Sequence, residues 1–480
     1  MNAGAFELVV GLEVHAQLLS ATKIFSPEAA RFGDAPNAQV SFITLAHPGT
    51  LPRLNDRVIE LAVRMGIACN CTIARHTTFD RKNYFYPDLP KGYQITQDRN
   101  PICKGGWIDL PDGTRVELDR IHLEEDAGKS IHEDNADESS IDLNRAGTPL
   151  IEIVTRPCMH TAESAASFLS EIRKIVRFLE VCDGNMEEGS LRADANVSVR
   201  PVGSTQLGKK VEIKNMNSVR NVRVAIESEF ERQVGLLEAG EEIISETRLF
   251  DVGSGKTFAM RQKEELNDYR YFPDPDLCAY TITDKWLEEV RQRMSGTPAS
   301  IAAEFITRFG LPEYDAHVLA AERTTARFFT AACDHTTQFK QVSNWIMGPV
   351  RAFLNDNPGI DIPIAPQQLA QLVDAIAAGT VSHTLATREV FPEMINNPSI
   401  PLSDILSRLT AGAPAGKDEL AAVVDEVIRI FPLKVEEYLN GKKAIIAMFM
   451  GEVMKRTGGK ADPKTANQLL SEKLNARKQK

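Results

Sequence analysis

Carboxylates interrupt five separated strand-like segments in which a folded core would favour valine, isoleucine or leucine. In the segment LVVGLEVHAQL, His15 follows Glu13 by two residues, and alternate residues of a strand point to the same face. A buried carboxylate needs a cation or a hydrogen-bonding partner. If the five segments belong to one sheet, their oxygens and one imidazole would suit Mg²⁺ or Mn²⁺. The other four segments, IHLEED, PLIEIV, SLRADANVSVR and KVEIKN, supply Glu124, Glu125, Glu152, Asp194 and Glu212.

For each segment there is an alternative, in which the acid lies on the solvated face of an ordinary antiparallel strand. Two segments argue against it. Glu152 is the only polar side chain between Pro149 and Thr155, in a run typical of a strand buried on both faces. Asp194 shares its predicted face with other polar side chains, Arg192, Asn196, Ser198 and Arg200.

Length and composition predict a large globular protein. With 480 residues, the chain exceeds a single hydrophobic core, so two or three domains are expected. We find neither a signal-like N-terminus nor a run of about 18 apolar residues, and we expect a cytoplasmic protein without a membrane segment. The seven scattered cysteines do not suggest a disulfide framework. Cys69 and Cys71 form only a CxC, distant from Cys103, so no zinc is expected.

The pattern along the chain predicts three parts. Residues 1–292, rich in short alternating runs, indicate an α+β domain with helices at Ala162–Cys182 and from Ser218 to about Leu237. Helical periodicity then predicts an all-helical domain, residues 293–410. After the linker-like TAGAPAGKDE, four short helices indicate a tail domain, residues 411–480.

The string GSGKT resembles the end of a phosphate-binding P-loop but lacks the required glycine five residues before Gly255. No helix is predicted after it. A hairpin turn between RLFDV and KTFAMR fits better. No GxGxxG opens a helix after a strand, so a Rossmann cofactor site is also unsupported.

Many longer strings resemble the B subunits of the aspartyl/glutamyl-tRNA(Asn/Gln) amidotransferases. They include GLEVHAQL, PGTLPRLN, DRKNYFYPDLPKGYQITQ, HLEEDAGKS, NRAGTPLIEIV, MEEGSLRADANVSVR, VEIKNMNS and DYRYFPDPDL, followed by LPEYDAHVL, SNWIMG and KADPK. The resemblance runs from about residue 8 to the C-terminus. It implies a catalytic domain similar to glutamine synthetase and guanidino kinases, followed by a helical domain and a tail domain.

The resemblance also implies an activity. Glutamate on tRNA(Gln), or aspartate on tRNA(Asn), is phosphorylated by ATP on its side-chain carboxylate, and ammonia then displaces phosphate. Magnesium would bridge the phosphate oxygens during transfer. The implied metal ligands are Glu13, His15, Glu124 or Glu125, Glu152, Asp194 and Glu212. Strand alternation puts Glu124 and Glu125 on opposite faces and leaves the choice between them open.

Several cations would bind phosphate groups or stabilise the acyl phosphate. Lys82 and Arg192 lie inside signature strings and, with Glu152 and Asp194, are the expected catalytic residues. For the nucleotide we expect Lys82, Tyr84, Lys129 and Lys214. Arg261 and Arg270 are further candidates. The tyrosines Tyr84, Tyr86 and Tyr93 would stack on a nucleotide base or on the terminal adenosine of tRNA, or simply form a packed aromatic loop.

The resemblance implies partners as well. No glutaminase or amidase signature occurs in the chain, so ammonia must come from an amidase subunit, and the family adds a small third subunit. Residues 411–480 hold 13 Lys and Arg against 9 Asp and Glu, whereas the whole chain has a net charge of −11. This tail would bind tRNA through phosphates and 2′-hydroxyls, unless it is only a solvated face. The candidate contacts are Lys442, Lys443, Lys455, Arg456 and Lys460.

The sequence departs from the family at a few positions. Some members bind zinc through a CxxC before PGTLP, where this chain has Ser41 and Thr44. Ala193, Arg156 and Cys158 also differ from the common residues, but none is a proposed ligand.

Two other functions remain open on the sequence: an ATP-dependent ligase for small carboxylates, and a tRNA-binding scaffold whose acids are structural. The sequence also leaves open the choice between the glutamate and aspartate reactions, the number of metal ions, the path of ammonia and the orientation of the tail.

Overall fold

The chain forms two compact units in a computed structural model, Met1–Pro298 and Ala299–Lys480. The structure describes residues 5–132, 138–262, 269–409, 417–458, 461 and 463–477. The first unit combines a large sheet with helices, and the described part of the second unit is helical. A mixed α/β region followed by a helical region is therefore confirmed. The division does not separate residues 411–480 from the helices before them, so the three-domain organisation stays a prediction.

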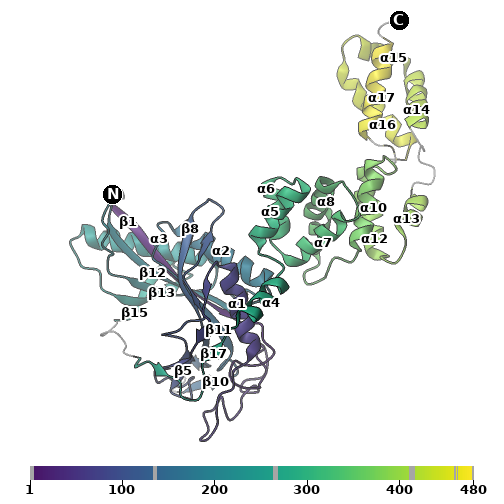
Figure 1. Ribbon diagram of the computed structural model, residues 1–480. Helices are drawn as coiled ribbons and strands as arrows, with labels where there is room; N and C mark the ends of the chain where they lie inside the picture. The colour runs from purple at the N-terminus through teal and green to yellow at the C-terminus, as the bar shows by residue number, and fades with distance from the viewer. Residues whose placement is uncertain are drawn as a thin grey trace. The chain divides into compact units, whose positions relative to one another are not determined.

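The large sheet places all five acid-bearing segments side by side (Figure 1). They form the consecutive strands β13, β12, β1, β11 and β8, paired antiparallel throughout. A parallel pair, β13 with β14, extends one edge. The order across the sheet is β15 (Lys256–Gln262), β14 (Glu246–Asp251), β13 (Val211–Met216), β12 (Leu191–Pro201), β1 (Phe6–Gln17), β11 (Pro149–Thr155), β8 (Arg115–Glu125), β6 (Cys103–Lys104) and β2 (Thr72–Ile73).

Shorter strands complete the first unit. The strand β7 (Trp107–Asp109) also pairs with β8. The other small sheets are β9 (Lys129–His132) with β10 (Ser139–Asp142), β4 (Asp80–Asn83) between β5 (Tyr93–Thr96) and β16 (Phe272–Pro273), and β3 (His76–Thr77) with β17 (Tyr280–Thr281).

Two amphipathic helices cover the apolar face of the sheet. The helix α2 (Ala162–Phe178) packs on β1, and α3 (Val219–Glu238) packs on β12, β13 and β15 and lies beside α2 (Figure 1). Thr161 and Ser218 cap them by accepting hydrogen bonds from backbone N–H groups. Both helices were predicted, and α2 ends four residues before the predicted Cys182. Residues 252–255 form the turn that joins β14 to β15, so the GSGKT string lies in a hairpin, as expected.

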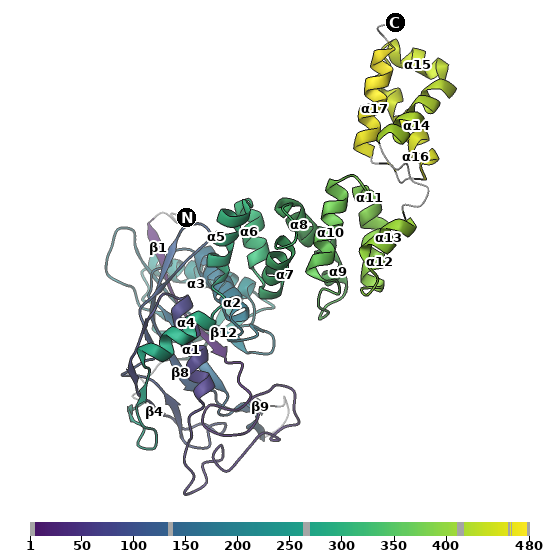
Figure 2. The same ribbon diagram turned by 45° about the vertical axis from the view of Figure 1, so that its right-hand side comes forward.

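Two further helices of the first unit were missed from the sequence. The helix α1 (Asp56–Ala68) is capped by Asn55 and buries Val58, Leu61, Ala62 and Met65 at helical spacing. The helix α4 (Asp284–Arg293), capped by Thr283, packs against α1 (Figure 2). Asparagine or threonine before an amphipathic run is a helix start signal that could have identified both.

In the second unit, apolar residues recur at helical spacing, as expected. Its last four α-helices bury a core around Val424, Phe449, Val453 and Leu470. Most of the linker-like segment lies outside the described residues. The elements are α5 (Pro298–Phe309), α6 (Glu313–Ala320), α7 (Arg323–Cys333), α8 (Phe339–Trp345), η1 (Ile346–Val350), α9 (Arg351–Asp356), α10 (Pro366–Ala377), α11 (His383–Leu385), η2 (Ala386–Val390), α12 (Phe391–Asn396), α13 (Leu402–Leu409), α14 (Lys417–Ile430), α15 (Pro432–Leu439), η3 (Lys443–Ile445), α16 (Ile446–Arg456) and α17 (Pro463–Ala476).

In the described parts of both units, we find no helix that is long and apolar enough to span a membrane.

Candidate functional site

Strand register places the polar side chains of the sheet on one shared face. His15 on β1 lies opposite Glu152 on β11 and Arg192 on β12, and Glu13 lies opposite Asp194. Because directly opposed residues of antiparallel strands point to the same side, these five side chains share the face that α2 and α3 leave uncovered.

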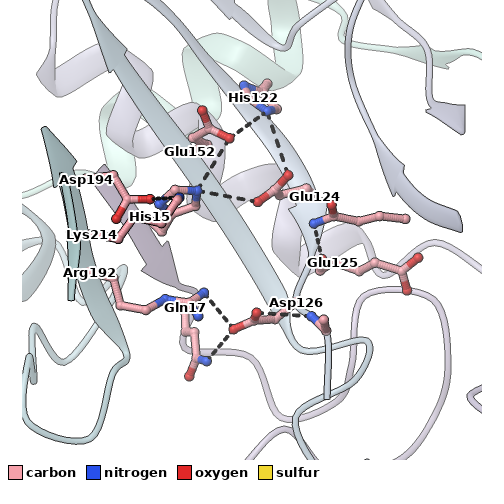
Figure 3. A network of polar contacts seen from close by, with 12 residues as sticks. His15, Gln17, His122, Glu124, Glu125, Asp126, Glu152, Arg192, Asp194 and Lys214 are labelled. Atoms are coloured by element: carbon pink, nitrogen blue, oxygen red, sulfur yellow. Dashed lines mark hydrogen bonds and ion pairs between the residues drawn. The ribbon is translucent and has the colours of Figure 1, made fainter. Parts of the chain in front are cut away.

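Two acids and two histidines form the centre of this face, which we call the acid–imidazole group (Figure 3). His15 Nε2 lies 3.5 Å from Glu152 Oε2 and 3.8 Å from Glu124 Oε1. On the other side, His122 Nε2 lies 3.4 Å from Glu152 Oε2 and 4.0 Å from Glu124 Oε2. One ligand atom each from His15, Glu124 and Glu152 lie within 4.8 Å of one another, close enough to hold one metal ion.

Burial and mutual charge shift the pKa values of this group. Burial raises the pKa of Glu124 to about 7, and the charge of Glu152 adds to the effect. Burial alone would lower the pKa of His15, but its hydrogen bond to Glu152 and the nearby carboxylates raise it to about 9. For Glu152, burial is outweighed by His122 and His15, so its pKa is lowered. Burial lowers the pKa of His122 to about 4, so His15 is the imidazole of this group that carries a proton at neutral pH.

A second set of acids lies beside the acid–imidazole group and is paired with the chain's own side chains. Lys214 Nζ lies 2.6 Å from Asp194 Oδ2 and 3.1 Å from Glu212 Oε1. Glu212 also accepts a hydrogen bond of 2.9 Å from Thr247 Oγ1. Of the predicted metal ligands, Asp194 and Glu212 therefore share a lysine.

Glu13 is the remaining predicted ligand on this face. Asn196 Nδ2 donates a 2.9 Å hydrogen bond to its carboxylate. Burial and the charge of Glu152 nevertheless raise the pKa of Glu13. Its position opposite Asp194 places it between the two sets of acids.

The structure separates Glu124 from Glu125. Glu124 points into the acid–imidazole group, whereas Glu125 forms an ion pair with Lys91 and accepts a 2.9 Å hydrogen bond from the Ile95 backbone N–H. The structure thus does not bring Glu125 to the group, because strand alternation directs it to the other face. Of these two acids, therefore, only Glu124 is positioned to bind a metal ion together with His15 and Glu152.

The predicted cations lie at different places around the group. Lys82 on β4 contacts the rings of Tyr269 and Tyr84, with its Nζ 4.9 and 5.8 Å from their centroids. Burial alone would lower the pKa of Lys82, but Glu124 and its other neighbours raise it. Arg192 Nη2 lies 2.8 Å from Asp126 Oδ2.

Other candidates are further from the centre. Lys129 lines a cavity of about 640 Å³ together with Asp142 and Arg145. Arg270 is exposed beside Tyr269, and the side chain of Arg261 lies outside the described residues.

Some residues of the site were missed from the sequence. His122 lies two residues before Glu124, so the alternation that paired Glu13 with His15 would also have paired these two. Asp126 was missed because its partners, Gln17 and Arg192, are remote in sequence. The Nδ1 atom of His122 is buried and has no hydrogen-bond partner among the described residues.

Two family models match most of the chain. The GatB/GatE catalytic domain matches residues 8–288, and the GatB domain matches residues 327–474. The chain is similar to proteins named as the B subunit of aspartyl/glutamyl-tRNA(Asn/Gln) amidotransferase. It is 45% identical over 474 residues to that of Syntrophotalea carbinolica, with 98% of each chain covered. For Thermoanaerobacter pseudethanolicus the identity is 46%, over 98% of this chain and 99% of the relative. For Alkalilimnicola ehrlichii it is 45%, over 98% and 100%. The chain therefore belongs to the family of aspartyl/glutamyl-tRNA(Asn/Gln) amidotransferase B subunits.

Proposed function

We propose that this chain is the ATP-dependent subunit of a tRNA-dependent amidotransferase. It is a ligase component that activates the side-chain carboxylate of glutamate on tRNA(Gln), of aspartate on tRNA(Asn), or of both, and converts it to the amide with ammonia. Membership of the family over nearly the full length carries this proposal. The acid–imidazole group, whose ligand atoms could hold a metal ion, supports a site for this chemistry on the large sheet.

A divalent cation, Mg²⁺ or Mn²⁺, fits the donors of the acid–imidazole group. His15, Glu124 and Glu152 would hold it, with Glu13, Asp194 and Glu212 as further oxygen donors on the same face. When bound, such a cation neutralises charge on transferring phosphate oxygens. An imidazole ligates a cation only when neutral, so binding would remove the proton that the acids retain on His15.

The chain's own cations complete the proposed chemistry. Lys82 faces Glu124 from β4 and would stabilise negative charge on the carboxyl phosphate. Arg192 would orient the same carboxylate from β12. Lys214, held between Asp194 and Glu212, is proposed to contact ATP phosphates, as are Lys82 and Lys129. Tyr84 is the proposed contact of the nucleotide base.

The proposal requires partner subunits. Ammonia would come from an amidase subunit that hydrolyses glutamine, assembled with a small third subunit into a heterotrimer. We also propose that the catalytic domain has a fold similar to that of glutamine synthetase and guanidino kinases. The domain boundaries are proposed to lie at residues 292/293 and 410/411.

The tail, residues 411–480, is proposed to bind tRNA. Lys443 lies over the ring of Tyr438, with its Nζ 3.8 Å from the centroid. Lys442 and Arg456 pair with Glu437 and Glu426, at 3.3 and 2.9 Å, which lowers the charge they offer to phosphates. Lys460 lies outside the described residues.

The test is amide formation on glutamyl-tRNA(Gln) by the reconstituted complex, with ATP and with ammonium chloride as nitrogen donor. Ammonium chloride removes any dependence on the glutaminase. Glu152→Ala and Asp194→Ala should each abolish amide formation, and Glu117→Ala, an exposed acid on β8, should leave it intact. Unchanged turnover in the first two variants would remove the acid face from the chemistry. Amidation of free glutamate would instead indicate a small-molecule ligase.

A further inference from the structure

One aromatic side chain near the acid–imidazole group is almost fully exposed. Phe85 lies in residues 84–92, which connect β4 to β5, and it is 88% exposed. No other large apolar side chain in the described part of the chain is exposed to this extent. An exposed phenylalanine beside a catalytic face leaves apolar surface in water that a ligand could cover.

The loop supports this ring from one side. A Cβ atom built on Gly92 would lie 3.1 and 3.3 Å from the Phe85 ring atoms Cε1 and Cδ1, so the ring rests against the glycine backbone. Gly92 has a φ of +71°, which a residue with a side chain rarely adopts. Backbone hydrogen bonds of 3.3 and 3.0 Å, from Tyr84 N–H to Gly92 O and from Gly92 N–H to Leu89 O, close the loop. The ring is therefore held in place while it stays open to solvent.

Tyr84 and Tyr93 are engaged by the protein, whereas Tyr86 is 51% exposed and thus less open than Phe85. Tyr84 donates a 3.2 Å hydrogen bond to Gln94 and packs edge-on against Tyr86 and Tyr269, at centroid distances of 5.7 and 6.0 Å. The guanidinium of Arg81 covers the ring of Tyr93 at 4.1 Å. These contacts leave Phe85 as the ring with the most open surface in this loop.

The loop that carries Phe85 begins directly after β4, the strand that carries Lys82. Lys82, the β4 residue whose charge faces Glu124, precedes Phe85 by three residues, a reach of roughly 10 Å. The adjacent strand β5 is fixed to the end of β8, because Gln94 donates a 2.6 Å hydrogen bond to the backbone oxygen of Glu125. In an aminoacyl-tRNA, the reacting carboxylate and the terminal base lie at opposite ends of one aminoacyl-adenosine. With the base on Phe85, the carboxylate at the other end could reach toward Lys82, which precedes this loop on β4.

We propose that Phe85 is the stacking platform for the unpaired terminal base at the 3′ end of the aminoacyl-tRNA. Every base has a flat π-face, and stacking on one aromatic ring orients it without reading its sequence. The other exposed side chains of this loop are those of Tyr86, Pro87 and Pro90, whereas a protein partner would need a larger continuous surface. This inference rests on the proposed function, because it assumes that tRNA is the substrate.

The experiment measures binding of uncharged tRNA to the assembled complex, without ATP or divalent-dependent turnover. Two ligands are compared: tRNA with its complete 3′ end, and the same tRNA lacking only the terminal adenosine. Removal of the adenosine should weaken binding to the wild type about 10-fold, within the range typical of one base stacked on one aromatic ring. Phe85→Ala should bind both ligands equally, at the weaker affinity. Phe85→Trp should restore the preference.

The control is Phe258→Ala, which removes an exposed phenylalanine from β15 and should keep the wild-type preference. If Phe85→Ala retains the 10-fold preference, the platform is wrong. A raised KM for ATP with unchanged tRNA binding would assign the ring to the adenine of ATP and overturn the proposal. Loss of the amidase subunit from the purified variant would likewise overturn it, in favour of a subunit contact. Since this binding assay involves no catalysis, its failure is distinguishable from failure of the acid face in the amidation assay.

Discussion

A buried carboxylate on helix α3, which covers one face of the sheet, and two carboxylates on the opposite face are compensated in different ways. On α3, the fully buried Glu229 accepts hydrogen bonds of 2.9 and 2.7 Å from Arg232 and bonds of 2.8 and 2.9 Å from Gln233 and Thr257. On the other face, Glu124 and Glu152 have two imidazoles and each other. Among the described residues, no lysine or arginine nitrogen lies within 4.0 Å of either carboxylate.

The difference distinguishes a structural acid from an acid available for a ligand. Glu229 has a fixed guanidinium whose fork matches its two oxygens, so an incoming cation would have to displace a partner already in place. Glu124 and Glu152 are balanced by the protonated imidazole of His15 instead, and a metal ion could replace its proton. Burial alone therefore does not identify a site. The identity of the compensating group does.

The largest expected effect is on catalysis. Glu152→Gln keeps the size of the side chain but removes the charge at the centre of the acid–imidazole group. Amide formation should fall more than about 100-fold, since loss of a partner outside the ligand shell already costs 10- to 100-fold. The variant should stay folded, because no buried arginine or lysine loses its partner. Steady-state amidation with ammonium chloride measures the first result and thermal unfolding the second. If this variant unfolds, Glu152 has a structural role like that of Glu229.

The opposite pattern is expected on the other face. Glu229→Ala leaves the guanidinium of Arg232 and the amide of Gln233 without their main acceptor in a buried setting. Loss of one partner of a buried pair typically costs 3–5 kcal/mol, so about that loss of unfolding free energy is expected. Denaturant unfolding of the first unit reports it. The turnover of the remaining folded enzyme should match the wild type, and a selective loss of turnover would contradict the structural role.

An effect of intermediate size is expected on the stabilisation of the chain by a bound metal ion. Mn²⁺ at 100 times its dissociation constant should stabilise the wild-type chain by about 2.7 kcal/mol, measured by thermal unfolding without ATP or tRNA. Glu124→Gln should lose this stabilisation. Its neighbour Glu125→Gln is the matched control and should retain it, because Glu125 faces Lys91. Equal responses of the two variants would argue against a metal site at Glu124.

Local patterns predicted much of this arrangement. Alternation identified the acid-bearing strands and put Asp194 on one face with Arg192 and Asn196, as the register shows. Helical spacing identified α2 and α3. The strand order and register depend on contacts between distant segments, such as β1 with β12, and no local pattern specifies them.

The same limit applies within the site. Alternation predicts that Glu124 and Glu125 point to opposite faces of their strand. Only the pairing of β8 with β11 shows which of the two lies on the same face as Glu152. The Lys214 bridge between Asp194 and Glu212, and the isolation of Lys129 in another cavity, likewise depend on tertiary packing. Residue type predicted which chemistry was available, and the fold determined which atoms meet.

The smallest expected effect concerns a buried cation whose close partners are neutral oxygens. Lys23 is fully buried, and its Nζ donates a 2.6 Å hydrogen bond to the backbone oxygen of Gln39. Burial lowers its pKa to about 8, although Glu28 and Glu125 oppose the shift. The unfolded chain retains this proton up to a pH of about 10.4.

Between these two values, the unfolded chain binds more protons at this position, so the Lys23 contribution to stability rises with pH, by at most about 1.4 kcal/mol per pH unit. Below pH 8 the cost of burying the charge is present in full. Lys23→Met should therefore show a shallower rise in unfolding free energy than the wild type across this window, while Lys285→Met on the exposed surface of α4 should follow the wild type. If the unfolding free energies of wild type and Lys23→Met change with pH in parallel, burial does not cost the Lys23 ammonium its proton. Neutral carbonyl oxygens would then compensate a buried charge as well as Arg232 compensates Glu229.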